Sequence, residues 1–491
     1  MPEYVQKTTF EECDLLIRNA SVIDGTGGPI SKADVAVSGD EIVGVGLLSC
    51  INAQVEIDAT ELCLAPGFID AHTHDDWALL RTPDMRFKVT QGVTTVVVGN
   101  CGISAAPFRA QEGLPDPFNV TPEVLSSSFE TVTDYRRAIN DKAPAINVRL
   151  LAGHSALRAT VMGPDLARAA TGEEINQMAE MLDKALTEGA AGLSSGLDYP
   201  AAIAAPMEEV VTLARVLRHH PNTVYTTHVR DEGDGVIEAI KEALATGQRA
   251  DVPLILSHHK CAGARNFGKS KATLAMIDAA RMQGEVALDV YPYTASSSAL
   301  MERFIGAAKD VLVIWSTPHP ECGGRTLNDI AAGWDVSREE ACAELKPAGA
   351  IYFDMDEQDV QRILRHPAAM IGSDGLPGTE KPHPRLWGTF PRVLGHYARD
   401  LKLFSLAKAV QKMTGLTAAK FGLIDRGEIS VGKKADLVLF DAEEISDLAD
   451  FDAPEQPAKG IHYVLVNGQI TLSRGRQTRT RAGRFLSSQS Q

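Results

Sequence analysis

A series of eight short apolar segments, most of them separated by helix-like stretches, is the feature that most constrains the fold of this chain. Each segment is rich in β-branched residues and is followed by polar ones, and stretches such as 175–188 and 235–246 between them have helical periodicity. Eight buried strands alternating with helices predict an α/β protein with a (β/α)8 TIM-like barrel, whose functional residues lie at the C-terminal ends of the strands. In chain order the segments lead into His72, Cys101, His154, Ser194, His228, His258, Tyr291 and Asp374.

An open, doubly wound sheet would also alternate strands with helices, but its nucleotide-binding form has a glycine-rich turn after the first strand. No such turn follows the first segment here, which continues as AHTHDD from Ala71. The barrel is therefore favoured. It brings the polar strand ends together in space although they are far apart in the sequence.

Both ends of the chain differ from the barrel region in their pattern. Residues 14–64 and the stretch beyond Gly422 contain short alternating strands separated by turns. We therefore expect residues 1–66 and 422–491 to form one small β-sandwich from both termini, and residues 67–421 to form the barrel. From about Arg474 the chain is polar and basic without an apolar period, which predicts a frayed tail.

Between about residues 292 and 350 the chain departs from a simple strand–helix unit, and this connection is far longer than is usual in barrels. We interpret it as an insertion over the barrel mouth that forms a lid and a wall of the substrate pocket. The alternative is a decoration remote from the site.

The composition is typical of a cytoplasmic enzyme. The 491 residues carry a formal net charge of −16 without a basic cluster, whereas nucleic-acid binding needs clustered Lys and Arg. No apolar run is long enough to cross a bilayer, and the N-terminus lacks a secretion signal. The seven cysteines are scattered and odd in number, as in a reducing compartment. We expect a small-molecule substrate, no nucleic acid and no membrane; no oligomeric state is predicted.

His72 and His74 lie one residue apart where the first segment opens into a loop. Alternate residues of a strand face the same side, so both imidazoles can bind one metal ion. A His-x-His pair also arises by chance and need not bind anything. The other His, Cys and Asp residues at later strand ends favour the metal site of a hydrolase.

Six short motifs together resemble the amidohydrolase superfamily, and closely the N-acyl-D-amino-acid deacylases. The resemblance implies a (β/α)8 barrel with a β-sandwich, zinc at the barrel mouth, and hydrolysis of the N-acyl group from a D-amino acid. The D-stereochemistry rests on the resemblance alone. The motifs are AHTHDD, GNCG, THVRDEG, SHHKCAG, GSDG and HPRLWGTFPRVLG.

By the same resemblance, Cys101, His228 and His258 hold one tight zinc ion. A thiolate with two imidazoles is a zinc-type ligand set that leaves a fourth position for water. His72 and His74 line a neighbouring position and share Cys101 as a bridge to a second, weaker metal. Many relatives bridge two metals with a carboxylated lysine on the fourth strand, but here that segment reads AAGLSSGLDY. A site with one metal is therefore an alternative, and Cys101 as a small core residue is another.

Asp374, in IGSDG, is the expected general base. A carboxylate beside a zinc-activated water can take its proton and later hand that proton to the leaving amine. The structural alternative is a turn or helix N-cap residue, which is typical of Asp before Gly.

A free α-carboxylate on the substrate needs a cationic partner, and a guanidinium offers it two parallel hydrogen bonds. We expect Arg385, in HPRLWG, to fill this role as the arginine of this motif does in relatives, with Tyr291 and Lys260 as further partners. Arg392 is expected to be structural. Lys260 and the serines at 296–298 would suit an acidic side chain, so D-glutamate, D-aspartate and other D-amino acids all stay open.

Two more histidines follow strand ends. His154 either contacts the substrate or is structural, and strand alternation turns His259 away from His258, which predicts a supporting role.

Two rival functions are a cyclic-amide hydrolase of the dihydroorotase or hydantoinase type and a metal-binding barrel without catalysis. The missing fourth-strand lysine argues against the first, and the joint presence of Cys101, His228, His258 and Asp374 argues against the second.

Overall fold

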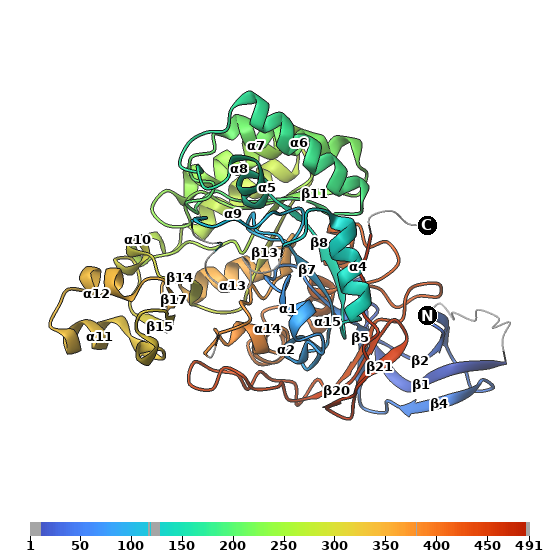
Figure 1. Cartoon of the computed structure of the whole chain (residues 1–491). Helices are drawn as coiled ribbons and strands as arrows, with labels where there is room; N and C mark the ends of the chain where they lie inside the picture. Colours follow the sequence, from blue (N-terminus) through green and yellow to red (C-terminus); the bar gives the residue numbers. More distant parts are fainter. Residues whose placement is uncertain (1–10, 116–117, 119–127, 380, 488–491) are drawn as a thin grey trace.

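The computed structural model describes residues 11–115, 118, 128–379 and 381–487, and Figure 1 shows how they are arranged. Parallel strands at eight positions form the barrel, which closes where Ala71 N donates to Ile371 O (3.1 Å) and Thr73 pairs with Gly375. The predicted (β/α)8 fold is confirmed. The barrel strands are β6 (Phe68–Asp70), β7 (Val93–Val98), β8 (Asn147–Leu150) continued by β9 (Ala152–Gly153), β10 (Gly192–Gly196), β11 (Val224–His228), β12 (Leu254–Leu256), β13 (Val286–Val290) and β18 (Ala369–Ile371).

Helices follow most barrel strands and cover the outside of the barrel (Figure 1). Several helices begin with a capping side chain. At the start of α6, Thr171 and Glu174 form a capping box, in which each side chain accepts a hydrogen bond from the backbone N–H of the other residue. The helices are α1 (Ala78–Arg81), α2 (Arg86–Val89), α4 (Val132–Lys142), α5 (His154–Met162), α6 (Gly172–Thr187), α7 (Met207–Ala214), α8 (Val236–Ala250), α9 (Ser270–Arg281), α13 (Glu357–Arg365), α14 (Arg385–Arg392), α15 (Leu406–Met413) and α16 (Gly415–Lys420).

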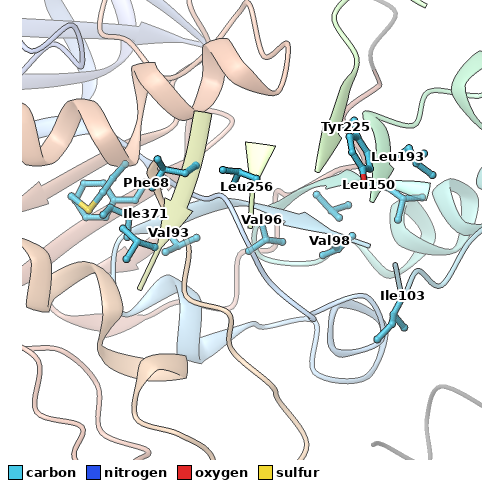
Figure 2. Close-up of a cluster of buried hydrophobic side chains, with 14 of the residues drawn as sticks. Phe68, Val93, Val96, Val98, Ile103, Leu150, Leu193, Tyr225, Leu256 and Ile371 are labelled. Atoms are coloured by element: carbon cyan, nitrogen blue, oxygen red, sulfur yellow. The ribbon is translucent and has the colours of Figure 1, made fainter. Parts of the chain in front are cut away.

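Nearly all residues of these strands are buried, because both faces of the parallel sheet are covered. Side chains on the outer face, such as Phe68, Val96 and Leu256, pack with residues of the surrounding helices (Figure 2). A second set fills the barrel interior, with one residue from each strand position, as expected for side-chain layers in a closed barrel. This set contains Ile69, Val97, Leu151, Ala191, Val224, Ile255, Ala287 and Met370.

Strands from both ends of the chain form one nine-stranded sheet. The N-terminal and C-terminal parts join where β5 pairs antiparallel with β19, which agrees with the β domain expected from both termini. Its strands are β1 (Glu12–Val22), β2 (Ser31–Ser38), β3 (Glu41–Gly46), β4 (Asn52–Asp58), β5 (Cys63–Pro66), β19 (Leu437–Phe440), β20 (Ile461–Val466), β21 (Gln469–Ser473) and β22 (Arg476–Gln477).

The segment between β13 and α13 forms a separate four-stranded antiparallel sheet with its own apolar core. Figure 1 shows this unit beside the barrel. It consists of β14 (Ser296–Ala299), α10 (Glu302–Ile305), β15 (Val311–Ser316), β16 (Arg325–Thr326), α11 (Leu327–Trp334), α12 (Arg338–Leu345) and β17 (Ala348–Tyr352). None of the helices in the described part of the chain has the length and apolar character needed to span a bilayer.

The prediction of a frayed tail from Arg474 is wrong for the described residues up to 487. Leu486 N donates to Val148 O (2.8 Å), and the Arg149 guanidinium donates to Leu486 O (3.0 Å). Leu486 is 8% exposed and packs in the interior cluster of the barrel. The tail has no apolar period because single side chains anchor it rather than a regular element.

We predict that Leu486→Ala costs about 2–3 kcal/mol of stability, because it removes methyl groups from the packed interior of the barrel. Thermal unfolding checks this as a lower midpoint. Arg481→Ala, which changes an exposed residue of the same segment, is the matched control and should leave the midpoint unchanged. Equal midpoints for both variants and the parent would show that the tail does not stabilise the barrel.

Candidate active site

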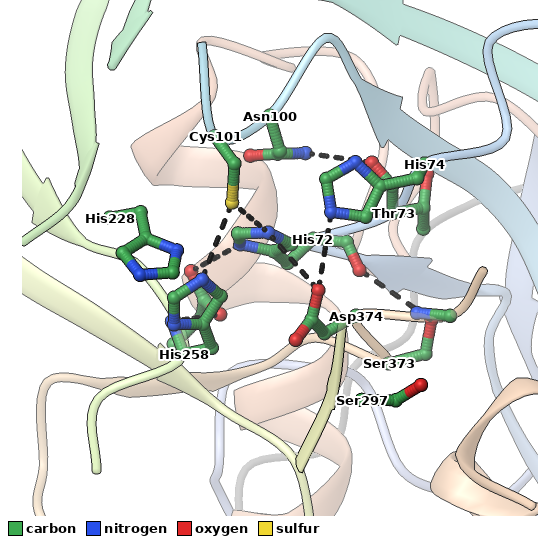
Figure 3. Close-up of polar contacts among 12 residues, drawn as sticks. His72, Thr73, His74, Asn100, Cys101, His228, His258, Ser297, Ser373 and Asp374 are labelled. Atoms are coloured by element: carbon green, nitrogen blue, oxygen red, sulfur yellow. Dashed lines mark hydrogen bonds and ion pairs between the residues drawn. The ribbon is translucent and has the colours of Figure 1, made fainter. Parts of the chain in front are cut away.

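Side chains from five strand ends converge at the mouth of the barrel (Figure 3). Cys101 Sγ lies 3.2 Å from His72 Nε2 and 3.3 Å from His258 Nε2. The potential metal-ligating atoms form three overlapping groups, and within each group they lie within 4.8 Å of one another. The groups are His72–His74–Cys101, Cys101–His228–His258 and His72–His258–Asp374.

The backbone bends sharply at three of these residues so that their side chains enter the mouth. Cys101, His258 and Asp374 have φ of 53°, 34° and 50°, in the left-handed region that non-glycine residues rarely adopt. Such conformations persist where the surrounding structure holds them, and they cluster at functional sites. Gly372 permits the close approach of β18, since a Cβ there would lie 2.5 Å from His72 Cβ.

A buried aspartate supports two of the histidines. Asp289, on β13, has Oδ2 3.4 Å from His72 Nδ1, and its Oδ1 accepts a hydrogen bond from His258 N (2.8 Å). A carboxylate on one ring nitrogen of a histidine fixes the ring and directs the other nitrogen toward a ligand. Sequence analysis missed Asp289, although a lone charge inside the apolar segment VALDV was a signal for it.

Glu232 contacts the ring of His258, whose backbone N–H is held by Asp289. Its Oε1 lies 2.9 Å from His258 Nδ1 and accepts a hydrogen bond from Lys260 Nζ (2.6 Å). Lys260 Nζ also lies 2.9 Å from His258 Nδ1. Sequence analysis missed Glu232 as well, and the motif THVRDEG had marked only its histidine.

His228 is held by a ring contact rather than by hydrogen bonds. Its imidazole packs edge-on against Tyr199, with ring centroids 4.9 Å apart. Both of its ring nitrogens are buried and have no hydrogen-bond partner among the described residues. Because buried polar atoms normally have a partner, these nitrogens indicate a ligand that they would bind.

The charges of the site reinforce one another. Burial alone would raise the pKa of the Cys101 thiol, but the neighbouring His72 and His258 hold it well below its usual value. Burial also opposes ionisation of Asp374, yet Arg385 and His258 hold the pKa of its carboxyl well below the usual range. Despite burial, the hydrogen bond to Asp374 raises the pKa of His74 to about 9. The thiolate and the carboxylate are therefore the forms present at neutral pH.

Asp374 lies between two cationic groups. Its Oδ1 is 3.2 Å from His74 Nε2, and its Oδ2 is 2.9 Å from Arg385 Nη1. Arg385, the first residue of α14, also donates to Ser297 O (3.2 Å), and its guanidinium lies 4.5 Å from the centre of the Tyr291 ring. Lys260 Nζ lies 5.5 Å from the same ring centre.

A cavity of about 880 Å³ opens above this cluster. His74, His228, His258 and Asp374 line it, as do the predicted substrate partners Lys260 and Tyr291. Arg385 is fully buried and stands behind the lining, where it reaches the cavity through Asp374 and Tyr291.

The inserted unit contributes to the wall of this cavity. Ser296–Ala299, Phe304 and Tyr352 are among the lining residues. Arg303 of α10 donates to Asp198 Oδ2 (2.7 Å), which ties the unit to the loop after β10. The reading of the insertion as a remote decoration is thus excluded.

His154 and His259 do not line the cavity. His154 Nε2 lies 2.9 Å from Glu209 Oε1 in a fully buried cluster. His259 Nε2 lies 2.8 Å from Thr273 Oγ1, and burial lowers the pKa of its imidazole to about 4. His259 has the surroundings of a structural histidine. His154 is held by Glu209 away from the cavity, and its Nδ1 has no hydrogen-bond partner among the described residues.

Three proteins from Alcaligenes xylosoxydans xylosoxydans are similar to this chain over nearly its full length. A D-aminoacylase is 49% identical over 473 residues, which cover 96% of this chain and 97% of the relative. An N-acyl-D-glutamate deacylase is 47% identical over 461 residues, with 93% of each chain covered. An N-acyl-D-aspartate deacylase is 45% identical over 475 residues, covering 97% and 95%.

Solved structures agree with these sequence matches. A D-aminoacylase structure, described as having a binuclear metal centre with one-metal activation and second-metal attenuation, superimposes with a TM-score of 0.94 at 49% identity, covering 97% of this chain and 100% of the other. An N-acyl-D-glutamate deacylase from Bordetella bronchiseptica, complexed with zinc and a phosphonate inhibitor, gives 0.93 at 43% identity, covering 98% and 100%. A D-hydantoinase, at 16% identity and a TM-score of 0.58, shares the fold.

The amidohydrolase family matches residues 55–472. This match covers the barrel and the strands that join it at both ends. Together with the full-length relatives, it shows that the chain belongs to the amidohydrolase family, within the group of D-aminoacylases and N-acyl-D-amino-acid deacylases.

Proposed function

We propose that this protein is a zinc-dependent enzyme that hydrolyses the amide bond of N-acyl-D-amino acids to a carboxylate and a free D-amino acid. The observation that carries the proposal is the Cys101–His228–His258 group with Asp374 on the cavity wall. The same reaction class is named for relatives that are 45–49% identical to this chain.

The side chains present fit a zinc ion. Cys101 supplies a thiolate, and His228 supplies buried nitrogens without a protein hydrogen-bond partner among the described residues. We assign the tight site to Cys101, His228 and His258, a set that leaves a fourth coordination position for water. His72 and His74, with Cys101 as a bridge, would hold a second, weaker metal, as the binuclear D-aminoacylase relative suggests. When bound, zinc polarises the amide carbonyl and lowers the pKa of water.

Asp374 acts as the general base and then as the general acid. Its carboxylate accepts the proton of the attacking water and returns that proton to the nitrogen of the leaving amino acid. His74 Nε2 and Arg385 Nη1, at 3.2 and 2.9 Å, hold the two carboxylate oxygens in place. The base is thus ionised and oriented before the substrate enters.

Lys260, Tyr291 and Arg385 form the proposed site for the substrate's α-carboxylate. The Lys260 ammonium and the Tyr291 ring face the cavity, and Arg385 adds a second cation behind them. The relatives are named N-acyl-D-glutamate deacylase, N-acyl-D-aspartate deacylase and D-aminoacylase, so acidic and apolar side chains both belong in the test.

The rival functions find less support. The hydantoinase likeness extends to the fold alone, and β10 carries the buried Ser194 and Ser195 where a bridging lysine would be needed. A barrel without catalytic activity would not need an ionised carboxylate, that of Asp374, beside the metal-ligating residues.

We place the protein in the cytoplasm, and its seven free cysteines support that location.

Hydrolysis of matched N-acetyl-D- and N-acetyl-L-amino acids by zinc-loaded protein tests the proposal, with leucine, methionine, glutamate and aspartate as side chains. Turnover restricted to the D-series is expected. Turnover of cyclic amides with none of the linear D-substrates would replace the proposal by the hydantoinase alternative.

Asp374→Ala and Cys101→Ala separate the base from the metal site. We expect Asp374→Ala to keep one zinc per chain and to lose kcat by orders of magnitude, because loss of general base catalysis alone costs about 10²–10⁴-fold. Cys101→Ala should lose zinc as well. Metal analysis and steady-state kinetics measure both effects.

Cys63→Ala is the control for the thiol, since Cys63 is a buried cysteine of β5 outside the cluster. It should keep both zinc and activity. Wild-type turnover by Asp374→Ala would rule out its role as base, and full zinc content in Cys101→Ala would rule out the ligand set.

Arg385→Ala should raise KM for substrates with a free α-carboxylate by about tenfold, because it removes the positive charge behind Lys260 and Tyr291. It should also lower kcat, because Arg385 contacts Asp374 (2.9 Å). The KM effect should vanish for the corresponding carboxylate-free amide, while the kcat effect persists.

Arg392→Ala is the matched control on the same helix. Its guanidinium binds Pro292 O and Asp447 (2.8 and 3.0 Å), so its loss should leave KM unchanged. An equal rise in KM for the acid and the amide with Arg385→Ala would contradict the carboxylate assignment.

A further inference from the structure

A lysine is buried beneath the two strand ends that carry His72 and Asp374. Lys88, on α2, has no exposed surface. Its Nζ lies 2.7 Å from Asp70 Oδ2, 2.8 Å from Ser373 Oγ and 3.3 Å from Asp75 Oδ2. A buried ammonium group is unfavourable unless it is paired and hydrogen-bonded. These contacts therefore hold Lys88 and its partners in fixed positions relative to one another.

The partners of Lys88 join β6 to β18. Asp70 is the last residue of β6, and its Oδ1 accepts hydrogen bonds from Ser373 N (2.7 Å) and His72 N (3.3 Å). Ser373 follows β18 and directly precedes Asp374. Lys88 therefore bridges the carboxylate of one strand end and the hydroxyl of the other.

The turn at Asp374 depends on that hydroxyl. Ser373 Oγ accepts hydrogen bonds from Lys88 Nζ and from Gly375 N (2.8 and 3.2 Å). Asp374 N donates to His72 O (2.8 Å), and Asp374 itself has φ of 50°. A non-glycine residue keeps a left-handed backbone conformation only where its surroundings hold it. Here the hydrogen bonds of Ser373 and Gly375, the residues before and after Asp374, hold that conformation.

We propose that Lys88 is a positioning residue for the reaction: it fixes the Ser373–Gly375 turn and thereby places the Asp374 carboxylate between His74 and Arg385. The inference rests on the proposed function for its kinetic consequence. Lys88 acts through Ser373 and Asp70, since it does not line the cavity.

A second buried lysine provides a matched control. Lys412, on α15, is 5% exposed, and its Nζ donates to His366 O and Ala369 O (2.5 and 3.1 Å). It therefore binds the opposite end of the same strand, β18, away from the cavity. Loss of these hydrogen bonds should destabilise the fold without moving Asp374.

The experiment compares Lys88→Met, Ser373→Ala and Lys412→Met with the parent enzyme. We expect Lys88→Met to lower kcat by about a hundredfold, the effect of displacing a catalytic group by about 1 Å. KM should stay within about twofold and the zinc content should stay at one per chain, since the tight ligands are untouched. Ser373→Ala should lower kcat in the same direction, and Lys412→Met should keep kcat while it lowers the unfolding midpoint.

A crystal structure of Lys88→Met gives a readout that does not depend on turnover. The Ser373–Gly375 turn should be rebuilt, with the Asp374 carboxylate displaced from His74 and Arg385. If the parent enzyme hydrolyses no N-acyl-D-amino acid, the proposed function fails, and this structure alone decides the positioning role.

Parental kcat in Lys88→Met, or an unmoved Asp374 in its crystal structure, would overturn the inference. An equal loss of kcat in Lys412→Met would also overturn it, by showing a general effect of removing a buried lysine. If Lys88→Met does not fold, Ser373→Ala decides, and parental kcat in that variant is the negative result.

Discussion

The contact between the Cys101 thiolate and the imidazoles of His72 and His258 is the interaction on which the rest of the site depends. A buried thiolate is stable only with positive or hydrogen-bonding partners, and its neighbours lie 3.2 and 3.3 Å away on two other strands. The barrel must therefore close to bring these strand ends together. Asp289 and Glu232 contact the Nδ1 atoms of His72 and His258, and thereby orient the Nε2 atoms of both rings toward the thiolate.

The same cluster links catalysis to substrate binding. Arg385 contacts the carboxylate of Asp374 and packs on Tyr291, so one cation serves both the proposed base and the proposed carboxylate site. The Asp374 carboxyl keeps a low pKa because that cation and the imidazoles surround it. A substrate carboxylate bound at Lys260 and Tyr291 would share this positive field.

Much of the fold and of the site was predictable from the sequence, and the limits have physical causes. Strand periodicity placed Cys101, His228 and Asp374 at strand ends on one rim of the barrel, and the resemblance to the N-acyl-D-amino-acid deacylases supplied their proposed roles. The contacts of the residues that support the site were not predictable, although the lone charge in VALDV marked Asp289 itself. Asp289 reaches His72 over 217 positions, and Lys88 reaches Ser373 over 285; such contacts depend on the pairing of strands and on rotamers, which no local pattern encodes.

The C-terminal tail, which begins at about Arg474, was also not predictable from local sequence patterns. Leu486 anchors the chain in the barrel through one side chain and a few backbone hydrogen bonds, and one side chain creates no periodicity. The insertion was recognisable by its length, whereas its contact with Asp198 through Arg303 is a property of the folded chain.

Anomalous X-ray diffraction at the zinc edge, from crystals of the zinc-loaded protein, shows which side chains hold the metal. We expect a strong peak about 2.3 Å from Cys101 Sγ and about 2.0–2.1 Å from nitrogens of His228 and His258, with a weaker peak or none between His72 and His74. A dominant peak at His72 and His74, or no peak beside Cys101, would contradict this assignment of the ligands.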